Sequence, residues 1–225
     1  MIITPKHDYE NNRDYALRIV RENIINMEIK PGSLIGEQEI ATMLNLSRTP
    51  VHEAFLELSK SKIIEIFPQK GCFVSYIDPE LINESRFLRK CIECAVVQEA
   101  CDVATEADIE ELEETINLQE FYNDKNNDKF LELDNEFHKI FYRICNKMQC
   151  YYMVSLMALH FDRVRSLSLL AVKDHKILED HKAILDAVRN KDKDKATAAF
   201  MKHMSRFDLE WDIIADKYGE YIKTE

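Results

Sequence analysis

The chain has 225 residues, 46% of them hydrophobic and 32% charged, which is the composition of an ordinary globular protein. No apolar run approaches the roughly 18 residues of a membrane span and the N-terminus has no secretory signal, so we expect a cytoplasmic protein with six reduced cysteines and no membrane contact. The net charge is −11, with 9 Lys and Arg against 11 Asp and Glu over residues 1–78 and 21 against 30 over residues 79–225, which excludes DNA binding through bulk positive charge.

The first 78 residues predict three helices followed by a hairpin. Gly (4 residues) and Pro (5) are scarce in the whole chain, which favours long helices over a fold with many tight turns. The three helices are expected at 9–27, at 37–44, and from Ser47 or Thr49 to about Lys60. The β-branched runs IIEIFP and CFVSYI then flank a turn at residues 69–71, a pattern that predicts a β-hairpin. Helix, helix, helix and hairpin is the order of a winged helix-turn-helix.

Everything after Asp78-Pro79 is predicted to be helical. Six helices are expected, at 80–103, 106–123, 126–145, 149–171, 174–190 and 192–217. The polar breaks between them are short, which favours an antiparallel bundle. The sequence therefore predicts a mainly α protein with two domains, a winged helix-turn-helix over residues 1–78 and an all-α bundle over residues 79–225.

The third predicted helix has the composition of a recognition helix. Such a helix lies in the major groove with its first residues at the base edges. Ser47 and Thr49 can cap the helix or bind phosphate. Arg48 can form a bidentate contact with guanine, and His52 lies one turn later on the same side.

The hairpin tip provides a second candidate contact with DNA. Lys70 and Gly71 occupy this tip, from which Lys70 can reach the DNA backbone or the minor groove. The alternative is a small helical domain in which Arg48 and Lys70 are merely solvated. The residue pattern by itself leaves both interpretations open.

Four polar residues of the bundle lie at core-facing positions of three helices: Asp134, His138, His181 and His203. Because Asp134 and His138 are four residues apart, they point the same way from one helix. A metal ion would satisfy all four groups, and three nitrogens with one oxygen suit Zn²⁺, Ni²⁺ or another first-row ion. The alternative is ordinary hydrogen bonding, with Asp134 paired to His138. Since His160 also lies on an apolar stripe, periodicity cannot separate it from the other histidines.

The string IGEQEIATMLNLSRTPVHEAFLELSKSKIIEIFPQKGCFVS resembles the winged helix-turn-helix of the GntR family of bacterial regulators, and the likeness covers about residues 10–76. The parts SRTPV-x-EA and KGCFV carry it most specifically. The resemblance implies binding to double-stranded operator DNA. Gln38 and His52 depart from the family pattern, which usually has Arg at these two DNA-contact positions. The operator sequence of the family therefore does not transfer to this chain.

Residues 80–215 resemble the FCD domain, the FadR-type C-terminal domain of one GntR subfamily, in the pieces RKCIE, DNEFHKIFY, EDHKAILDAV and MKHM. The resemblance implies that the metal ligands are Asp134, His138, His181 and His203, and it matches His160 to no ligand. Arg89 matches an arginine that holds the carboxylate of an effector, and Asn146, at the turn after the second piece, is assigned to the same pocket. The alternative for Arg89 is a surface ion pair with Glu93.

The function we expect is that of a homodimeric, ligand-responsive transcriptional regulator, not an enzyme. It would bind operator DNA and hold a small carboxylate effector at a divalent transition metal, Zn²⁺ or Ni²⁺. Two alternatives stay open. A metal with a free coordination position could serve a hydrolase, and Cys91-x2-Cys94 could serve a thiol-redox regulator, although small buried thiols in the core are the preferred reading.

Overall fold

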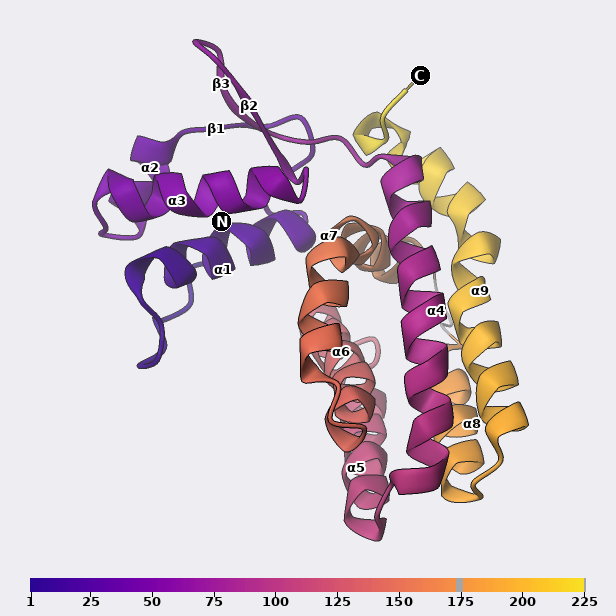
Figure 1. The fold of residues 1–225 in the computed structure, drawn as a ribbon. Helices are drawn as coiled ribbons and strands as arrows, with labels where there is room; N and C mark the ends of the chain where they lie inside the picture. The colour runs from indigo at the N-terminus through magenta and orange to yellow at the C-terminus, as the bar shows by residue number, and fades with distance from the viewer. Residues whose placement is uncertain (173–175, 225) are drawn as a thin grey trace.

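The computed structural model describes residues 1–172 and 176–224, which form nine α-helices, one short 3-10 helix and one three-stranded sheet (Figure 1). A winged part built from the first three helices and the sheet is followed by a bundle of six helices. The predicted fold class, a mainly α chain with a winged helix-turn-helix before a helical bundle, is confirmed.

The winged part contains α1 (Asn12–Ile25), β1 (Leu34–Ile35), α2 (Glu37–Met43), α3 (Arg48–Lys60), β2 (Ile64–Phe67) and β3 (Gly71–Val74). Strand β3 lies in the centre of the sheet and pairs antiparallel with both other strands. The prediction of a two-stranded hairpin was therefore incomplete. Strand β1 has only two residues, too few to show the alternation by which a strand is recognised in a sequence.

The apolar face of α3 builds the centre of the winged part. Val51, Ala54 and Phe55 have no exposed surface, and Leu58 is 2% exposed. These side chains recur at helical spacing, so they lie on one side of α3 and pack against α1. The opposite side of α3 is exposed to solvent and carries Arg48, Thr49 and His52.

The bundle contains α4 (Pro79–Val103), α5 (Glu106–Tyr122), α6 (Asn127–Ile144), α7 (Met148–Ala171), α8 (Ile177–Arg189), α9 (Lys193–Tyr218) and the 3-10 helix η1 (Gly219–Tyr221). Asp78, Thr105, Asn126 and Asp192 each accept a backbone N–H in the first turn of the helix that follows. The predicted helix at 174–190 begins, as described, at Ile177; residues 174 and 175 lie outside the described residues.

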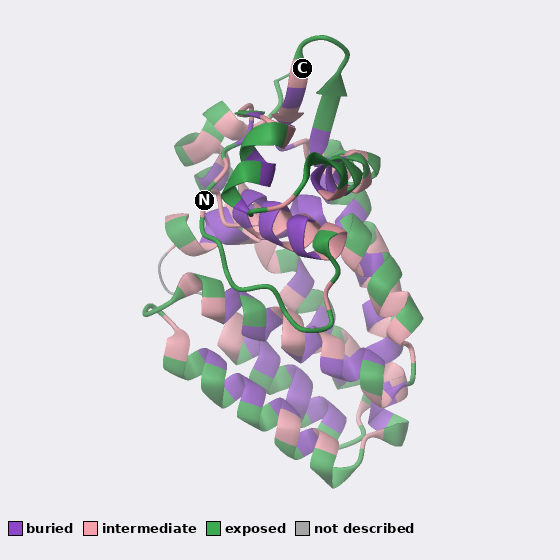
Figure 2. Ribbon diagram, turned by 90° about the vertical axis from the view of Figure 1, so that its left-hand side faces the viewer, coloured by how far each residue is buried: buried purple, intermediate pink, exposed green. Residues whose placement is uncertain are grey.

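The six helices of the bundle surround one apolar core, towards which their buried faces point (Figure 2). Helix α4 packs against α7 and α9, α5 against α6 and α8, and α8 against α9. No helix among the described residues is long and apolar enough to cross a membrane.

Helix α7 joins the bundle to the winged part. Leu159 is buried within the apolar core of the winged part. The ring of His160 donates from Nε2 to the carbonyl oxygen of Ser61 at 2.7 Å, and Arg163 donates to the carbonyl oxygen of Ser75 at 2.7 Å. One face of α7 thus holds the end of α3 and the segment that connects β3 to α4.

Candidate functional site

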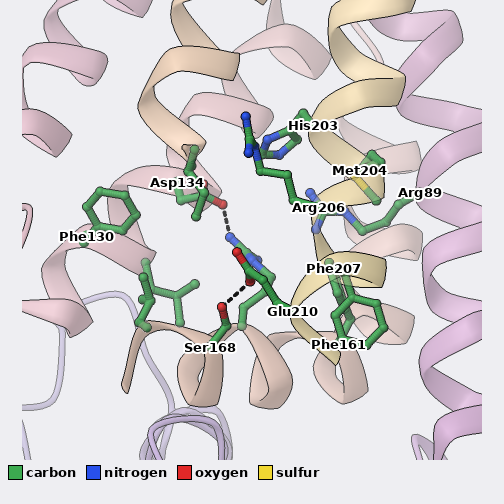
Figure 3. Close-up of a pocket in the computed structure, with 14 residues that line it drawn as sticks. Arg89, Phe130, Asp134, Phe161, Ser168, His203, Met204, Arg206, Phe207 and Glu210 are labelled. Carbon is green, nitrogen blue, oxygen red and sulfur yellow. Dashed lines mark hydrogen bonds and ion pairs between the residues drawn. The ribbon is translucent and has the colours of Figure 1, made fainter. Parts of the chain in front are cut away.

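Three imidazole rings meet in the core of the bundle. His138 on α6, His181 on α8 and His203 on α9 bring one nitrogen atom each within 4.8 Å of one another. His138 and His181 are buried and His203 is nearly so. In the close-up of Figure 3, His203, Asp134 and Arg89 line one cavity, with Asp134 and Arg89 on opposite sides of the view. The structure therefore brings together three histidines that lie up to 65 positions apart in the chain.

Each of the three rings has one buried nitrogen without a hydrogen-bond partner among the described residues, and that of His203 lies 4.0 Å from Asp180 Oδ2. These atoms are Nε2 of His138, Nε2 of His181 and Nδ1 of His203. A buried polar atom without a partner costs free energy, so three such atoms on neighbouring rings call for a ligand. A metal ion is the ligand whose requirements this donor set meets, since neutral imidazole nitrogen is a good donor to Zn²⁺ and Ni²⁺.

The opposite nitrogens of two rings are held by hydrogen bonds that determine the tautomer. His138 donates from Nδ1 to Glu93 Oε2 at 2.9 Å, and His181 donates from Nδ1 to Gln119 Oε1 at 2.8 Å. With the proton on Nδ1, each Nε2 keeps its lone pair for a metal. Glu93 and Gln119 are thus positioning residues for the cluster.

Burial keeps the three rings neutral. It lowers the pKa of His138, and it lowers the pKa of His181 and His203 well below the ordinary value, helped by the neighbouring rings. Burial acts to raise the pKa of Glu93, but the Arg89 guanidinium and the His138 ring outweigh it and lower that pKa well below its usual range. The site therefore combines neutral imidazoles with an ionised carboxylate.

Asp134 lies beside two of the three rings. Its Oδ1 is 3.4 Å from Nε2 of His181, and its Oδ2 is 3.9 Å from Nε2 of His138. The carboxylate also forms an ion pair with Arg165 of α7. Asp134 is placed to add an oxygen to the three nitrogens, with Arg165 balancing its second oxygen.

A cavity of about 60 Å³ opens next to the cluster, lined by Asp134, His203 and three arginines (Figure 3). The arginines are Arg89, Arg165 and Arg206. Arg89 is 5% exposed and makes a two-fold contact with Glu93, at 2.8 and 3.2 Å. The ion pair considered as an alternative role for Arg89 is therefore present, but it lies inside the bundle and at the cavity rather than on the surface.

A wider cleft of about 900 Å³ shares Arg89, Leu131 and Arg165 with this cavity. Arg89, Glu93 and His138 line one end of it, and residues of α1 and the N-terminal segment line the other. The cleft therefore lies between the bundle and the winged part. A small molecule at the histidine cluster has this space available in addition to the inner cavity.

Two of the polar residues considered in the sequence lie elsewhere. Asn146 is exposed in the turn between α6 and α7, with a φ of 55°, and lines neither cavity, so the structure does not bring it to Arg89. His160 is 3% exposed but lies at the contact between the two parts of the chain. Its Nε2 donates to Ser61 and its Nδ1 accepts from Arg163 at 3.2 Å, so neither nitrogen is free for a metal.

The start of α3 presents its charged side chains to solvent. Arg48 and His52 have side chains 67% and 50% exposed, and both are held by one carboxylate, that of Glu37 on α2. Arg48 Nε donates to Glu37 Oε2 and His52 Nδ1 to Oε1, each at 2.7 Å. Burial acts to raise the pKa of Glu37, but these two hydrogen bonds outweigh it and lower that pKa. Gln38, the neighbouring residue of α2, is exposed.

The remaining candidate DNA contacts are also exposed. Ser47 occupies the N-cap position of α3 without a hydrogen bond from its side chain to the described helix, and Thr49 is exposed beside it. Lys70 is exposed at the tip between β2 and β3. Gly71 has a φ of +113°, and a Cβ there would lie 2.8 Å from Leu34 Cδ1, so the wing requires glycine at this position.

Sequence reasoning missed three residues that organise these sites. Gln119 follows Ile109, Leu112 and Ile116 on the buried face of α5, a position where a polar side chain signals a specific partner. Arg165 sits in the apolar stretch of α7 and gave the same kind of signal. Glu37 gave none, because only the packing of α2 on α3 brings its carboxylate to Arg48.

The described cysteines are all free. Burial raises the pKa of Cys72, Cys101 and Cys145, that of Cys145 to about 11. Thiols with raised pKa values are protonated at neutral pH and are poor nucleophiles. Cys91 is exposed on α4 and Cys94 is half-buried against the core.

Comparisons with known proteins match both parts of the chain. The family model described as "FCD domain" matches residues 84–206, and that described as "Bacterial regulatory proteins, gntR family" matches residues 14–74. The chain is 32% identical to the HTH-type transcriptional repressor RspR of Escherichia coli K12 over 92% of each protein. It is 25% identical to the Galactonate operon transcriptional repressor of the same strain, over 84% of this chain and 92% of the other. The solved structure of E. coli McbR/YncC shares the fold, with a TM-score of 0.79 at 19% identity, over 93% of this chain and 99% of that one.

Proposed function

This chain belongs to the GntR family of bacterial regulatory proteins and carries an FCD domain, and from that membership we propose that it is a homodimeric, metal-containing regulator whose affinity for operator DNA responds to a small organic acid. The observation that carries the proposal is the meeting of three imidazole rings, each with a buried nitrogen that has no hydrogen-bond partner among the described residues, next to a cavity lined by arginines. A divalent transition metal, Zn²⁺ or Ni²⁺, suits these donors.

The metal would be held by His138, His181 and His203, with Asp134 as the fourth group. When bound, it supplies positive charge to which a carboxylate coordinates. Arg89 and Arg165 supply further positive charge in the same cavity, and a guanidinium forms short, paired hydrogen bonds with a carboxylate. The name of one relative refers to galactonate, a sugar acid, which is consistent with an organic acid as the ligand.

Helix α7 provides the connection from this cavity to the DNA-binding part. Arg165 on one face of α7 forms ion pairs with Asp134 and, at 2.7 Å, with Asp162. His160 and Arg163 on another face hold the end of α3 and the segment after β3. A ligand that competes for Arg165 changes the contacts of α7. The same helix contacts the winged part through His160 and Arg163. A shift between two arrangements of the chain would then alter operator affinity.

DNA binding rests on the exposed start of α3. Ser47, Arg48, Thr49 and His52 would contact the major groove and the adjacent phosphates, and Lys70 at the wing would contact the backbone or minor groove. A dimer places two such helices about one DNA turn apart on a near-palindromic site. Gln38 and His52, where the family usually has arginine, give this chain its own operator preference.

A second copy of the chain would complete this regulator. The α4 and α9 segments joined by the ion pair between Arg86 and Asp208 at 2.7 Å expose Phe87, Leu209 and Ile213, at 70, 76 and 48%. Large apolar side chains gathered on two adjacent helices mark an interaction surface. We place the contact between the two copies there.

Two other functions are weighed against the regulator. A hydrolase with the same metal would convert its ligand, whereas a sensor releases it unchanged. A thiol-redox regulator would lose its response when Cys91 or Cys94 is replaced by serine. Cys94 packs against the apolar core of the bundle, which favours a structural role for this thiol.

The decisive experiment uses the full chain and DNA fragments selected from its own genome. Fluorescence anisotropy is measured for the zinc-loaded and the chelator-treated protein, with and without small carboxylic acids, and each acid is recovered and analysed. We expect a salt-dependent complex whose affinity changes with one class of acid only when metal is bound. An affinity that no acid changes, or an acid that is consumed, would contradict the proposal.

A further inference from the structure

The cleft between the two parts of the chain is a single space lined by both of them. On the bundle side α4, α6 and α7 contribute Arg89, His138 and Asp162, and on the winged side α1 contributes Arg18 and Arg21. At about 900 Å³ the cleft has the size of a ligand site, whereas the inner cavity of about 60 Å³ holds only a few water-sized groups. A ligand at the histidine cluster that is longer than a few atoms extends towards α1.

The cationic groups of this cleft differ in whether they have a counter-ion. Most form ion pairs within the chain: Arg18 with Glu10, Arg89 with Glu93, Lys129 with Glu132, Lys139 with Glu136, and Arg165 with Asp162. Arg21 forms no hydrogen bond and no ion pair with any of the described residues, although it is half-buried. Among the described arginines and lysines that line the cleft, Arg21 is the one without an ion-pair partner.

Arg21 faces the bundle across the cleft. Burial raises the pKa of Asp162 to about 6, and the charges of Arg89 and Arg21 both oppose this rise. Arg21 and Arg89 therefore act on the same carboxylate, one from the winged part and the other from the bundle. Although its charge also acts on Glu22, the half-buried guanidinium of Arg21 has no hydrogen-bonded anion among the described residues, and an anionic group of a ligand would provide one.

We propose that the effector is an elongated molecule with two anionic groups, one held at Arg89 and the histidine cluster and the other at Arg21 of α1. The inference rests on the proposed effector site and adds a second anchor to it. Arg21 becomes a ligand-binding residue of the DNA-binding part, and the chemical class of the ligand narrows to dianions such as dicarboxylates with a spacer.

Such a ligand would change DNA recognition through α1. Helix α1 packs against α3, whose first turn carries Arg48. A dianion that ties α1 to the bundle favours one arrangement of the two parts of the chain over others. The ligand then shifts the equilibrium by its differential affinity for that arrangement, as any two-state regulator requires.

Isothermal titration calorimetry with the zinc-loaded full chain tests the inference. The probes are α,ω-dicarboxylates from succinate to suberate, each paired with the monocarboxylate of the same chain length. We expect one dicarboxylate to bind at least tenfold more tightly than its monocarboxylate. In Arg21→Met this preference falls to within twofold while the monocarboxylate affinity stays unchanged, and Arg21→Lys retains part of it. The matched control Lys129→Met, at a cleft cation that has a partner, keeps the full preference.

The outcomes separate this inference from the proposed function. Equal binding of the paired acids by the wild type, or an equal loss of both acids in Arg21→Met, overturns the second anchor and leaves a simple carboxylate site. Failure of every acid to bind the zinc-loaded wild type overturns the effector class and the second anchor together. Thermal unfolding of each variant checks its folding. If Arg21→Met does not fold, the wild-type series and Arg21→Lys decide.

Discussion

The guanidinium of Arg163 donates a hydrogen bond of 2.7 Å to the carbonyl oxygen of Ser75, so a fully buried cation of the bundle holds the segment that leads out of the winged part. A second nitrogen of Arg163 lies 3.3 Å from the carbonyl oxygen of Tyr76. Two residues further along α7, Arg165 pairs with Asp134 at the inner cavity. The cavity and the connection between the two parts are thus joined by one turn of helix.

Replacement of Arg163 by methionine should lower the stability of the fold and weaken the coupling between ligand binding and operator affinity. The change removes the donor to Ser75 and Tyr76, which should lower the free energy of unfolding by about 2 kcal/mol and make operator affinity insensitive to ligand. Urea denaturation and anisotropy measure the two effects. The control Arg143→Met, at an exposed ion pair with Glu111, should cost no more than about 0.5 kcal/mol. Wild-type stability in Arg163→Met would contradict the role of this contact.

The metal prediction distinguishes the histidines that bind the ion from the one that does not. His181→Ala should lose bound zinc in elemental analysis of protein reconstituted without an affinity tag. Gln119→Leu, which removes the acceptor for His181 Nδ1, should weaken zinc binding about 10–100-fold. His160→Ala is the matched control, since both nitrogens of that buried ring already have partners, and it should retain zinc. Metal loss in His160→Ala, or retention in His181→Ala, would refute the assigned ligands.

Arg48 should be essential for operator recognition. Its side chain is exposed at the start of α3, so Arg48→Ala should raise the dissociation constant for the selected operator by roughly 10–100-fold, equivalent to about 1–3 kcal/mol for a bidentate base contact. Binding to random DNA should change much less. Arg189→Ala removes an exposed, ion-paired arginine of the bundle and serves as the control. Anisotropy that shows equal operator affinity for Arg48→Ala and wild type would rule out this contact.

The proposed contact between two copies predicts a monomeric variant. Phe87 is 70% exposed on α4. Phe87→Glu would bury an unpaired charge in the apolar contact between the two copies, and the free energy that this costs would favour the monomer. We expect light scattering to give the mass of a dimer for the wild type and of a monomer for the variant. Phe121→Glu, at a 58% exposed position on α5, should remain dimeric. A dimeric Phe87→Glu would place the contact elsewhere.

Stability should fall in acid partly because of His160. Burial lowers the pKa of His160 to about 4, from an ordinary value of 6.5. Between these values the unfolded chain binds a proton that the folded chain does not, so the contribution is complete above pH 6.5 and is lost as the pH falls towards 4. Between pH 7 and pH 5 the metal-free wild type should lose roughly 2 kcal/mol more than His160→Gln. Parallel urea titrations at the two pH values measure this difference, and equal losses would contradict it.

The fold was largely predictable because it depends on local patterns. Apolar residues at helical spacing, such as Val51, Phe55 and Leu58, and short polar breaks such as the one at Thr105 act within a few residues. Strand β1 escaped prediction because two residues carry no periodic signal, and its pairing with β3 is a contact across almost 40 residues.

The candidate sites also have some features that the sequence predicts and others that depend on tertiary contacts. Motifs in the sequence were enough to predict the family, and their order, by resemblance to that family, gave the four candidate ligands and the candidate DNA contacts at the start of α3. Only the tertiary structure separated His160 from the other histidines, moved Asn146 away from the pocket, and placed Arg21 across from Arg89. The reason is physical: whether a buried polar atom is satisfied, and which cation lacks a counter-ion, depends on partners that distant segments bring, and no local pattern in the chain encodes them.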